Sequence, residues 1–346
     1  METPQTTNTY GLRNYFPDSG VYGQPHPLLF TEPNDTLRAF TADDLRQLPD
    51  PTVLDLTDGS QIRAFQVLPK GEHDESRTVV QVMDYANGVA AHSNAATIAI
   101  AELLGVRVIV LPQSDIQLSR RERQFVRYGD LTPLHSKQAE GLEQMVADEE
   151  NLTLLGVSFG AQAVVGLSKA INENGVKRND RVVAIEPPNT VRRSKRQLLR
   201  DFRVAGNPQW AQATRQSGWQ ALIDVVGVAD SDSSDYMKQD NVRFMRRALQ
   251  LTNIAILGAM QQDSFAEDLR AAGFYLPADG RVLIAKERHS AMVPGFGLED
   301  AYDYAVKSYQ LGKKLGAACI ESADSEQSVG HAVGNNPLVK ASLAAV

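Results

Sequence analysis

The sequence predicts an α/β protein with a mostly parallel, eight-stranded sheet flanked by helices. Two features lead to this fold class: short β-branched runs alternate with amphipathic helical stretches, and one antiparallel hairpin precedes them. Asp58-Gly59-Ser60 supplies the hairpin turn, because glycine readily adopts the positive φ that a tight turn needs. The predicted strands are residues 52–57, 61–68, 78–83, 106–111, 152–157, 181–185, 281–285 and 317–320, and the predicted helices of the core are 93–104, 137–148, 159–171 and 336–345.

The alternation stops between Pro187 and Pro277, where the pattern is helical throughout. We therefore divide the chain into an N-terminal extension (1–51, partly packed on the core), a core (52–186 and 277–346) and a helical lid (187–276) over the strand ends. The predicted lid helices span 194–202, 210–226 and 235–272. The first is strongly basic, which is typical of a solvated helix face or of a rim that attracts anions. Its cations are Arg192, Arg193, Lys195, Arg196, Arg200 and Arg203.

Composition excludes several classes of protein. The net charge of −7 over 346 residues predicts no general attraction to nucleic acid or to anionic lipid. The one cysteine, Cys319, cannot form an internal disulfide, and the polar N-terminus does not resemble a signal peptide. No run approaches the roughly 20 apolar residues of a membrane span. We therefore expect a cytoplasmic protein. Metal-ligand and nucleotide-binding motifs are absent, so neither a metal nor a cofactor is expected.

The sequence Gly156-Val157-Ser158-Phe159-Gly160 is a candidate nucleophile turn. A Gly-x-Ser-x-Gly match by itself is weak evidence, but here an apolar strand precedes it and a helical pattern with Ala161 and Ala163 follows it. A sharp turn from strand to helix needs small residues on both sides of the nucleophile. The context favours Ser158 as a strained nucleophile.

From residue 52 to the C-terminus the chain resembles the α/β-hydrolase superfamily. The resemblance rests on the Ser158 turn and on the loop Met83-Asp84-Tyr85-Ala86-Asn87-Gly88, which matches the family's oxyanion loop but lacks its histidine. It implies that the amides of Ala86 and Phe159 hold the oxyanion of an acyl-transfer reaction. Asn87-Gly88 is equally typical of an ordinary turn.

The same resemblance implies the other catalytic residues, because the family's chain order is nucleophile, acid, histidine. It favours His331, between the last strand and last helix, as the base, although a plain loop histidine fits too. His289 occupies the usual position of the acid, so Glu287 is the first candidate acid and Glu186 the alternative. His289 itself is expected to bind substrate, and a second interpretation makes it the base.

These residues predict a serine hydrolase that cleaves an ester, thioester or amide bond through a Ser-His-acid arrangement. An acyltransferase on the same scaffold is the closest alternative, since the same groups serve if water is excluded. A non-catalytic binding protein is the other, because fold alone does not establish activity. The expected partner is a small-molecule acyl substrate, without nucleic acid or membrane, and a homo-oligomer stays open.

Overall fold

The computed structural model describes residues 10–14, 35–86, 91–146, 151–173, 179–185, 187–188, 192–204, 220–226, 235–262, 264–275, 281–285 and 318–322. Seven strands in these stretches form the main sheet, in the order β2-β3-β5-β4-β6-β7-β8. The strands are β2 (Thr52–Asp55), β3 (Gln61–Val67), β4 (Asp74–Val82), β5 (Val106–Leu111), β6 (Asn151–Val157), β7 (Asn179–Ile185) and β8 (Arg281–Ala285). β2, β3 and β5 pair antiparallel, and β5, β4, β6, β7 and β8 pair parallel.

The hairpin and the parallel strands form where the sequence predicts them. Gly59 in the hairpin turn has a φ of +79°, which explains the glycine. In β6 both alternating sets of side chains are buried, because helices cover the two faces of a parallel sheet. This burial accounts for its continuously apolar sequence.

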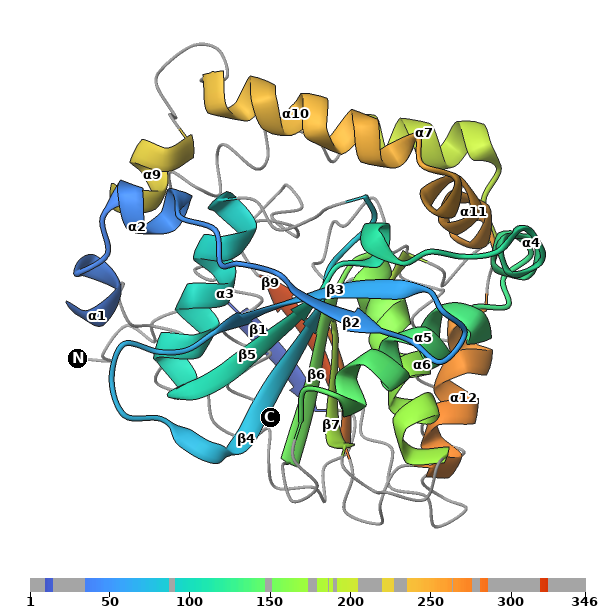
Figure 1. The fold of residues 1–346 in the computed structure, drawn as a ribbon. Helices are drawn as coiled ribbons and strands as arrows, with labels where there is room; N and C mark the ends of the chain where they lie inside the picture. The colour runs from blue at the N-terminus through green and yellow to red at the C-terminus, as the bar shows by residue number, and fades with distance from the viewer. Residues whose placement is uncertain are drawn as a thin grey trace, which may run out of the picture.

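Helices lie on both sides of this sheet (Figure 1). α3 lies on one side, whereas α5, α6 and α12 lie on the other, and α6 packs against both α5 and α12. The helices that the structure describes are α1 (Asp35–Arg38), α2 (Ala42–Arg46), α3 (Ala91–Leu104), α4 (Arg120–Arg127), α5 (Thr132–Glu143), α6 (Phe159–Glu173), α7 (Lys195–Val204), α9 (Gln220–Val226), α10 (Asp235–Ala248), α11 (Leu251–Ala259) and α12 (Phe265–Tyr275), with a 3₁₀ turn η3 (Gln113–Asp115).

The carboxyl ends of β4 and β6 lie at a switch in the sheet topology. β4 and β6 are neighbours, with Val82 opposite Gly156, yet the chain leaves β4 toward β5 on one side and leaves β6 toward β7 on the other. Ligands of open α/β sheets bind in the crevice that such a divergence creates. The topology therefore places the most favourable binding position between the residues that follow Val82 and those that follow Val157.

The last strand departs from the prediction of an eight-stranded sheet. β9 (Ala318–Ser322) pairs antiparallel with β1 (Tyr10–Asn14) in a separate two-stranded sheet, so the main sheet has seven strands in the described part of the chain. A strand pattern predicts extended backbone but does not specify its partner. Here the partner comes from the opposite end of the chain, which local pattern does not reveal.

Some helix boundaries also differ from the predictions. The single helix expected over 235–272 is three helices, α10, α11 and α12, and Gln250 with extended backbone (ψ 144°) separates the first two. α5 begins at Thr132 rather than at residue 137, because Pro133 in its first turn suits a helix start. η3 and α4 were not predicted. α4 has a capping box formed by Ser119 and Glu122, a local signal that the apolar pattern does not contain.

Part of the N-terminal extension contacts the rest of the chain. Leu37 and Leu45 are fully buried and Phe40 nearly so. Asn94 of α3 donates hydrogen bonds from Nδ2 to the carbonyls of Leu45 (3.3 Å) and Gln47 (3.1 Å). Among the helices of the described residues, none is long and apolar enough to cross a membrane.

Candidate active site

Ser158 lies in a sharp turn between β6 and α6. Its φ is +55°, a left-handed conformation that costs a non-glycine residue about 1–3 kcal/mol. Two hydrogen bonds hold the turn: the Ser158 amide donates to the Ile185 carbonyl (2.8 Å), and the Ala161 amide donates to the Ser158 carbonyl (2.9 Å). Ser158 is only 2% exposed. The surrounding ladder and helix thus hold the serine in an unfavourable backbone conformation, as a nucleophile turn does.

The two flanking glycines are required by close backbone contacts. A Cβ on Gly156 would lie 2.1 Å from the Gly160 carbonyl oxygen, and a Cβ on Gly160 would lie 2.3 Å from the Val82 carbonyl oxygen. No real Cβ makes contacts this short with backbone. The start of α6 therefore packs directly on the last residue of β4. A side chain at Gly160 would push α6 away from β4, and a side chain at Gly156 would push the two ends of the Ser158 turn apart.

The described part of the loop after β4 ends at a second strained residue. Ala86 has a φ of +56° and is fully buried. Ala86 and Ser158 are the two non-glycine residues with positive φ in the described part of the chain, and they follow neighbouring strands. The amides of Ala86 and Phe159 have no acceptor among the described residues. Both residues are fully buried.

Two further residues, which the sequence analysis missed, hold this loop in place. Gln113, fully buried in η3 after β5, donates from Nε2 to the Met83 carbonyl at 2.6 Å. Tyr85 packs its ring edge-on against Phe244 of α10, with 6.2 Å between the ring centroids. Burial raises the pKa of Tyr85 to about 12, so its hydroxyl keeps its proton. The sequence could have pointed to Gln113, because it directly follows a predicted parallel strand, the position where ligand-binding residues of such sheets lie.

Comparison with solved structures found proteins of similar fold. The proline iminopeptidase of Mycobacterium smegmatis superimposes with a TM-score of 0.50 at 13% identity, over 86% of this chain and 100% of that chain. This chain has the α/β-hydrolase fold. An esterase of Pyrobaculum calidifontis matches with a TM-score of 0.47 at 11% identity, covering 88% of this chain and 87% of that chain.

The enol-lactonase of Burkholderia xenovorans matches with a TM-score of 0.44 at 16% identity, over 80% of this chain and 92% of that chain. No protein-family model matches the sequence, and no curated protein does. At these identities the likeness concerns the fold alone. In the α/β-hydrolase fold, the nucleophile turn follows a central strand and opens a helix, which is where Ser158 lies.

The remaining predicted site residues fall outside the described part of the α/β-hydrolase fold. These are His331, Glu287, Glu186 and His289. The structure therefore brings together Ser158, Phe159 and Ala86, and the base, the acid and the substrate-binding histidine stay predictions. His135 is a different case, since it packs against Gly166, eight residues or about 12 Å along α6 from Ser158. Burial lowers the pKa of His135 to about 3, so it stays neutral.

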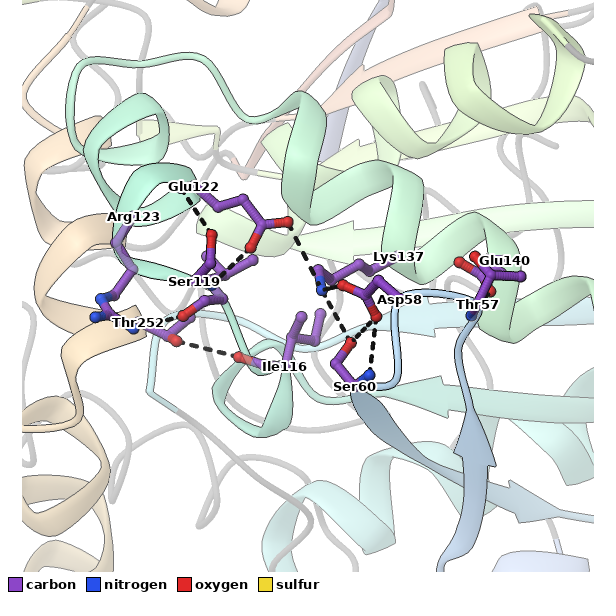
Figure 2. A network of polar contacts seen from close by, with 11 residues as sticks. Thr57, Asp58, Ser60, Ile116, Ser119, Glu122, Arg123, Lys137, Glu140 and Thr252 are labelled. Atoms are coloured by element: carbon purple, nitrogen blue, oxygen red, sulfur yellow. Dashed lines mark hydrogen bonds and ion pairs between the residues drawn. The ribbon is translucent and has the colours of Figure 1, made fainter.

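The most extensive ionic cluster of the described residues lies away from this site, between the hairpin turn, α4 and α5 (Figure 2). We call it the Lys137 network. The buried Lys137 ammonium donates to Asp58 and to Ser60 Oγ (2.9 Å), and it lies 3.7 Å from Glu122. The hydrogen bond from Lys137 holds the pKa of Asp58 well below its usual range. This lysine is fully paired, so the network joins structural elements and offers no free group for chemistry.

No group of three or more His, Cys, Asp or Glu side chains is placed to hold a metal ion within the ranges that the structure describes. At the β4–β6 edge, the described residues include a serine with strained backbone and the buried residues Ala86 and Phe159.

Proposed function

We propose that this protein is a serine hydrolase that cleaves an ester, thioester or amide bond with Ser158 as the nucleophile. The observation that carries the proposal is the pair of strained residues at neighbouring strand ends, Ser158 and Ala86. Backbone strain of this kind persists only where the surrounding structure enforces it, and it is concentrated at functional sites. The esterase and lactonase among the structures of similar fold agree with this class of reaction.

In the proposed reaction, Ser158 Oγ attacks the substrate carbonyl carbon while His331 takes the hydroxyl proton. The negative charge on the carbonyl oxygen is held by the amides of Ala86 and Phe159, and such a donor contributes about 2.7–4 kcal/mol to transition-state stabilisation. His331 then protonates the leaving group as the tetrahedral intermediate collapses to an acyl-enzyme. Water, activated by the same histidine, releases the acid and regenerates Ser158.

The roles of the other predicted residues follow from this scheme. Glu287 is proposed to orient His331, with Glu186 as the alternative, and His289 to contact the substrate. The helices between β7 and β8 are proposed to limit substrate size, and the contact of Phe244 with Tyr85 places α10 against the loop that carries Ala86.

The decisive experiment is intact mass after treatment with a fluorophosphonate, which reacts with activated serines. Wild type is expected to gain one adduct and Ser158→Ala none. Ser114→Ala is the matched control, because Ser114 also follows a strand of the sheet and is 6% exposed, close to Ser158. Ser114→Ala should label like wild type. A folded wild-type protein without an adduct would remove the hydrolase proposal and favour a non-catalytic binding protein.

The base is tested by the rate of the same labelling reaction. His331→Ala is expected to slow labelling by at least about a thousandfold, because the serine loses the group that takes its proton. His289→Ala is expected to change the rate much less, since His289 contacts substrate only. Slow labelling of His289→Ala with normal labelling of His331→Ala would assign the base to His289.

A further inference from the structure

The outer sides of α10 and α11 carry an unusual concentration of exposed apolar side chains. Five of the ten large apolar residues that are exposed in the described chain lie between residues 242 and 254, and each is between 45% and 70% exposed. They are Val242, Met245, Leu249, Leu251 and Ile254, which we call the α10–α11 face. Contiguous apolar surface of this kind marks an interaction site.

Helix geometry shows that α10 has two apolar sides. Phe244 and Ala248, four residues apart, pack against the hydrophobic core. Val242, Met245 and Leu249 follow the spacing i, i+3, i+7 and form a second stripe, about a third of a turn around the helix from Phe244 and Ala248. A helix that needed only to cover the core would present polar residues there, so the outer stripe is not explained by the fold of the chain.

In the first turn of α11 the polar residues are buried and the apolar residues are exposed, the reverse of the usual arrangement. Thr252 and Asn253 are buried, whereas Leu251 and Ile254 are exposed. The buried residues are held by hydrogen bonds: Thr252 Oγ1 donates to the Ile116 carbonyl (3.1 Å), and Asn253 Nδ2 donates to the Arg247 carbonyl (2.7 Å). Figure 2 shows the first of these contacts. These bonds hold Thr252 and Asn253 on the inner side of α11, which also carries Ile256, so Leu251 and Ile254 lie on the exposed side.

The charges within residues 242–262 are all positive, although Asp240 and Asp263 flank this stretch in the sequence. Between Val242 and Gln262 the sequence has three arginines and no acidic residue, although the whole protein carries a net charge of −7. Arg246 is exposed and lies four residues from Val242, on the same stripe. The start of α7 adds exposed cations, and it is tied to this region by a hydrogen bond from the Arg193 amide to the Gln261 carbonyl (3.0 Å). The exposed cations there are Arg192, Lys195, Arg196 and Arg200.

We propose that the α10–α11 face docks on the surface of a bilayer that contains anionic phospholipids. An apolar stripe flanked by arginines is what an interfacial helix needs: the apolar side chains enter the acyl boundary while the cations meet lipid phosphates. A symmetric contact with a second copy of the chain would instead bring these arginines together, and their repulsion opposes it. The net charge of −7 predicts no membrane binding, but it averages over this local distribution.

Docking of the α10–α11 face would bring the bilayer close to the candidate active site. Phe244, on the inner side of α10, contacts Tyr85 in the loop that ends at Ala86. A bilayer on the outer side of α10 would therefore lie one helix away from the β4–β6 edge (Figure 1). Docking itself does not depend on the serine chemistry, so the two proposals can fail separately.

The test is sedimentation of the full-length protein with vesicles of phosphatidylcholine alone or of phosphatidylcholine mixed equally with phosphatidylserine. Wild type is expected to sediment only with the mixed vesicles, and less as salt is raised. Met245→Asp with Leu249→Asp should lower the partition coefficient on the order of a hundredfold, because two apolar anchors are lost. Arg246→Gln should lower it about fivefold.

Matched controls lie elsewhere on the surface. Val53→Asp with Leu68→Asp replaces two apolar residues of similar exposure, and Arg63→Gln removes an exposed arginine of β3. Both should bind vesicles like wild type. Thermal melting checks that every variant is folded. The proposal is overturned by equal binding to both vesicles, by no binding, or by controls that lose binding equally. It is likewise overturned if the only effect of Met245→Asp with Leu249→Asp is to abolish self-association seen by light scattering.

Discussion

The β4–β6 edge and the Lys137 network are built in opposite ways. At the edge, Ser158 and Ala86 have strained backbones, and the amides of Ala86 and Phe159 lack acceptors among the described residues. In the Lys137 network every charge has a partner, from Asp58 and Ser60 to Glu122. Polar groups whose hydrogen bonds are satisfied within the protein are compatible with a stable fold. Backbone strain and unsatisfied donors lower stability, and they are retained where they serve a function. The difference shows that the Lys137 network contributes to stability, and it supports our proposal that the β4–β6 edge carries the chemistry.

The largest effect expected at the edge comes from Gly160→Ala. Its Cβ would lie 2.3 Å from the Val82 carbonyl, so α6 must move away from β4, at a cost of about 3 kcal/mol or more in unfolding free energy. Fluorophosphonate labelling should be lost as well. Gly71→Ala is the control, because nothing lies within 4 Å of the added Cβ. Equal denaturation midpoints for the two variants would contradict the close contact.

A third kind of polar site differs from both, since here a largely buried carboxyl accepts hydrogen bonds from neutral side chains. Asp268 of α12 accepts a hydrogen bond from Gln162 of α6, and burial raises the pKa of Asp268 to about 7. The folded state thus keeps a proton that the unfolded state loses near pH 4. This contribution to stability is fully present below pH 4 and is lost as the pH rises through 7.

Asp268→Asn should therefore remove the decline in stability between pH 4 and 8, an effect of about 2 kcal/mol after allowance for partial exposure of the side chain. Urea denaturation at several pH values measures it. A decline that persists unchanged in the variant would show that another group titrates. Asp43→Asn is the control, because Asp43 is on the exposed surface.

Within the Lys137 network, the two partners are expected to differ. Asp58→Asn should cost about 2 kcal/mol, because it leaves the Lys137 ammonium, whose side chain is 7% exposed, without its nearest counter-ion. Lys137→Met should cost less, since the carboxylate that remains is half exposed and stays hydrated. Neither variant should change the rate of fluorophosphonate labelling. A larger loss of stability for Lys137→Met than for Asp58→Asn would reverse this interpretation.

The smallest effect is a gain. Ser158→Gly should raise the unfolding free energy by about 1 kcal/mol, because glycine adopts a φ of +55° without strain, while it abolishes labelling. Ser158→Ala serves as the comparison, since alanine keeps the strain and should not gain stability. Ala86→Gly should gain a similar amount and still label, because its amide is retained. A loss of stability in both glycine variants would show that the strain argument is wrong.

The sequence by itself determined the seven strands of the main sheet and the turn that carries Ser158. Hydrophobic patterning is local, and glycines at 156 and 160 around a serine between an apolar strand and a helical pattern specify a sharp turn. The hairpin at Asp58-Gly59-Ser60 was predicted in the same way, from turn residues between two strand patterns. The position of Ala86 beside the serine came from the resemblance of its loop to a known family.

Only the tertiary structure decided the contacts between distant segments. The pairing of β9 with β1, the support of the Ala86 loop by Gln113 and the contact of Phe244 with Tyr85 each join parts of the chain that no periodicity connects. The outward rotation of α11 likewise depends on where Thr252 and Asn253 find hydrogen-bond partners. A residue pattern fixes which side of an element is apolar, but whether that side is covered depends on the rest of the chain.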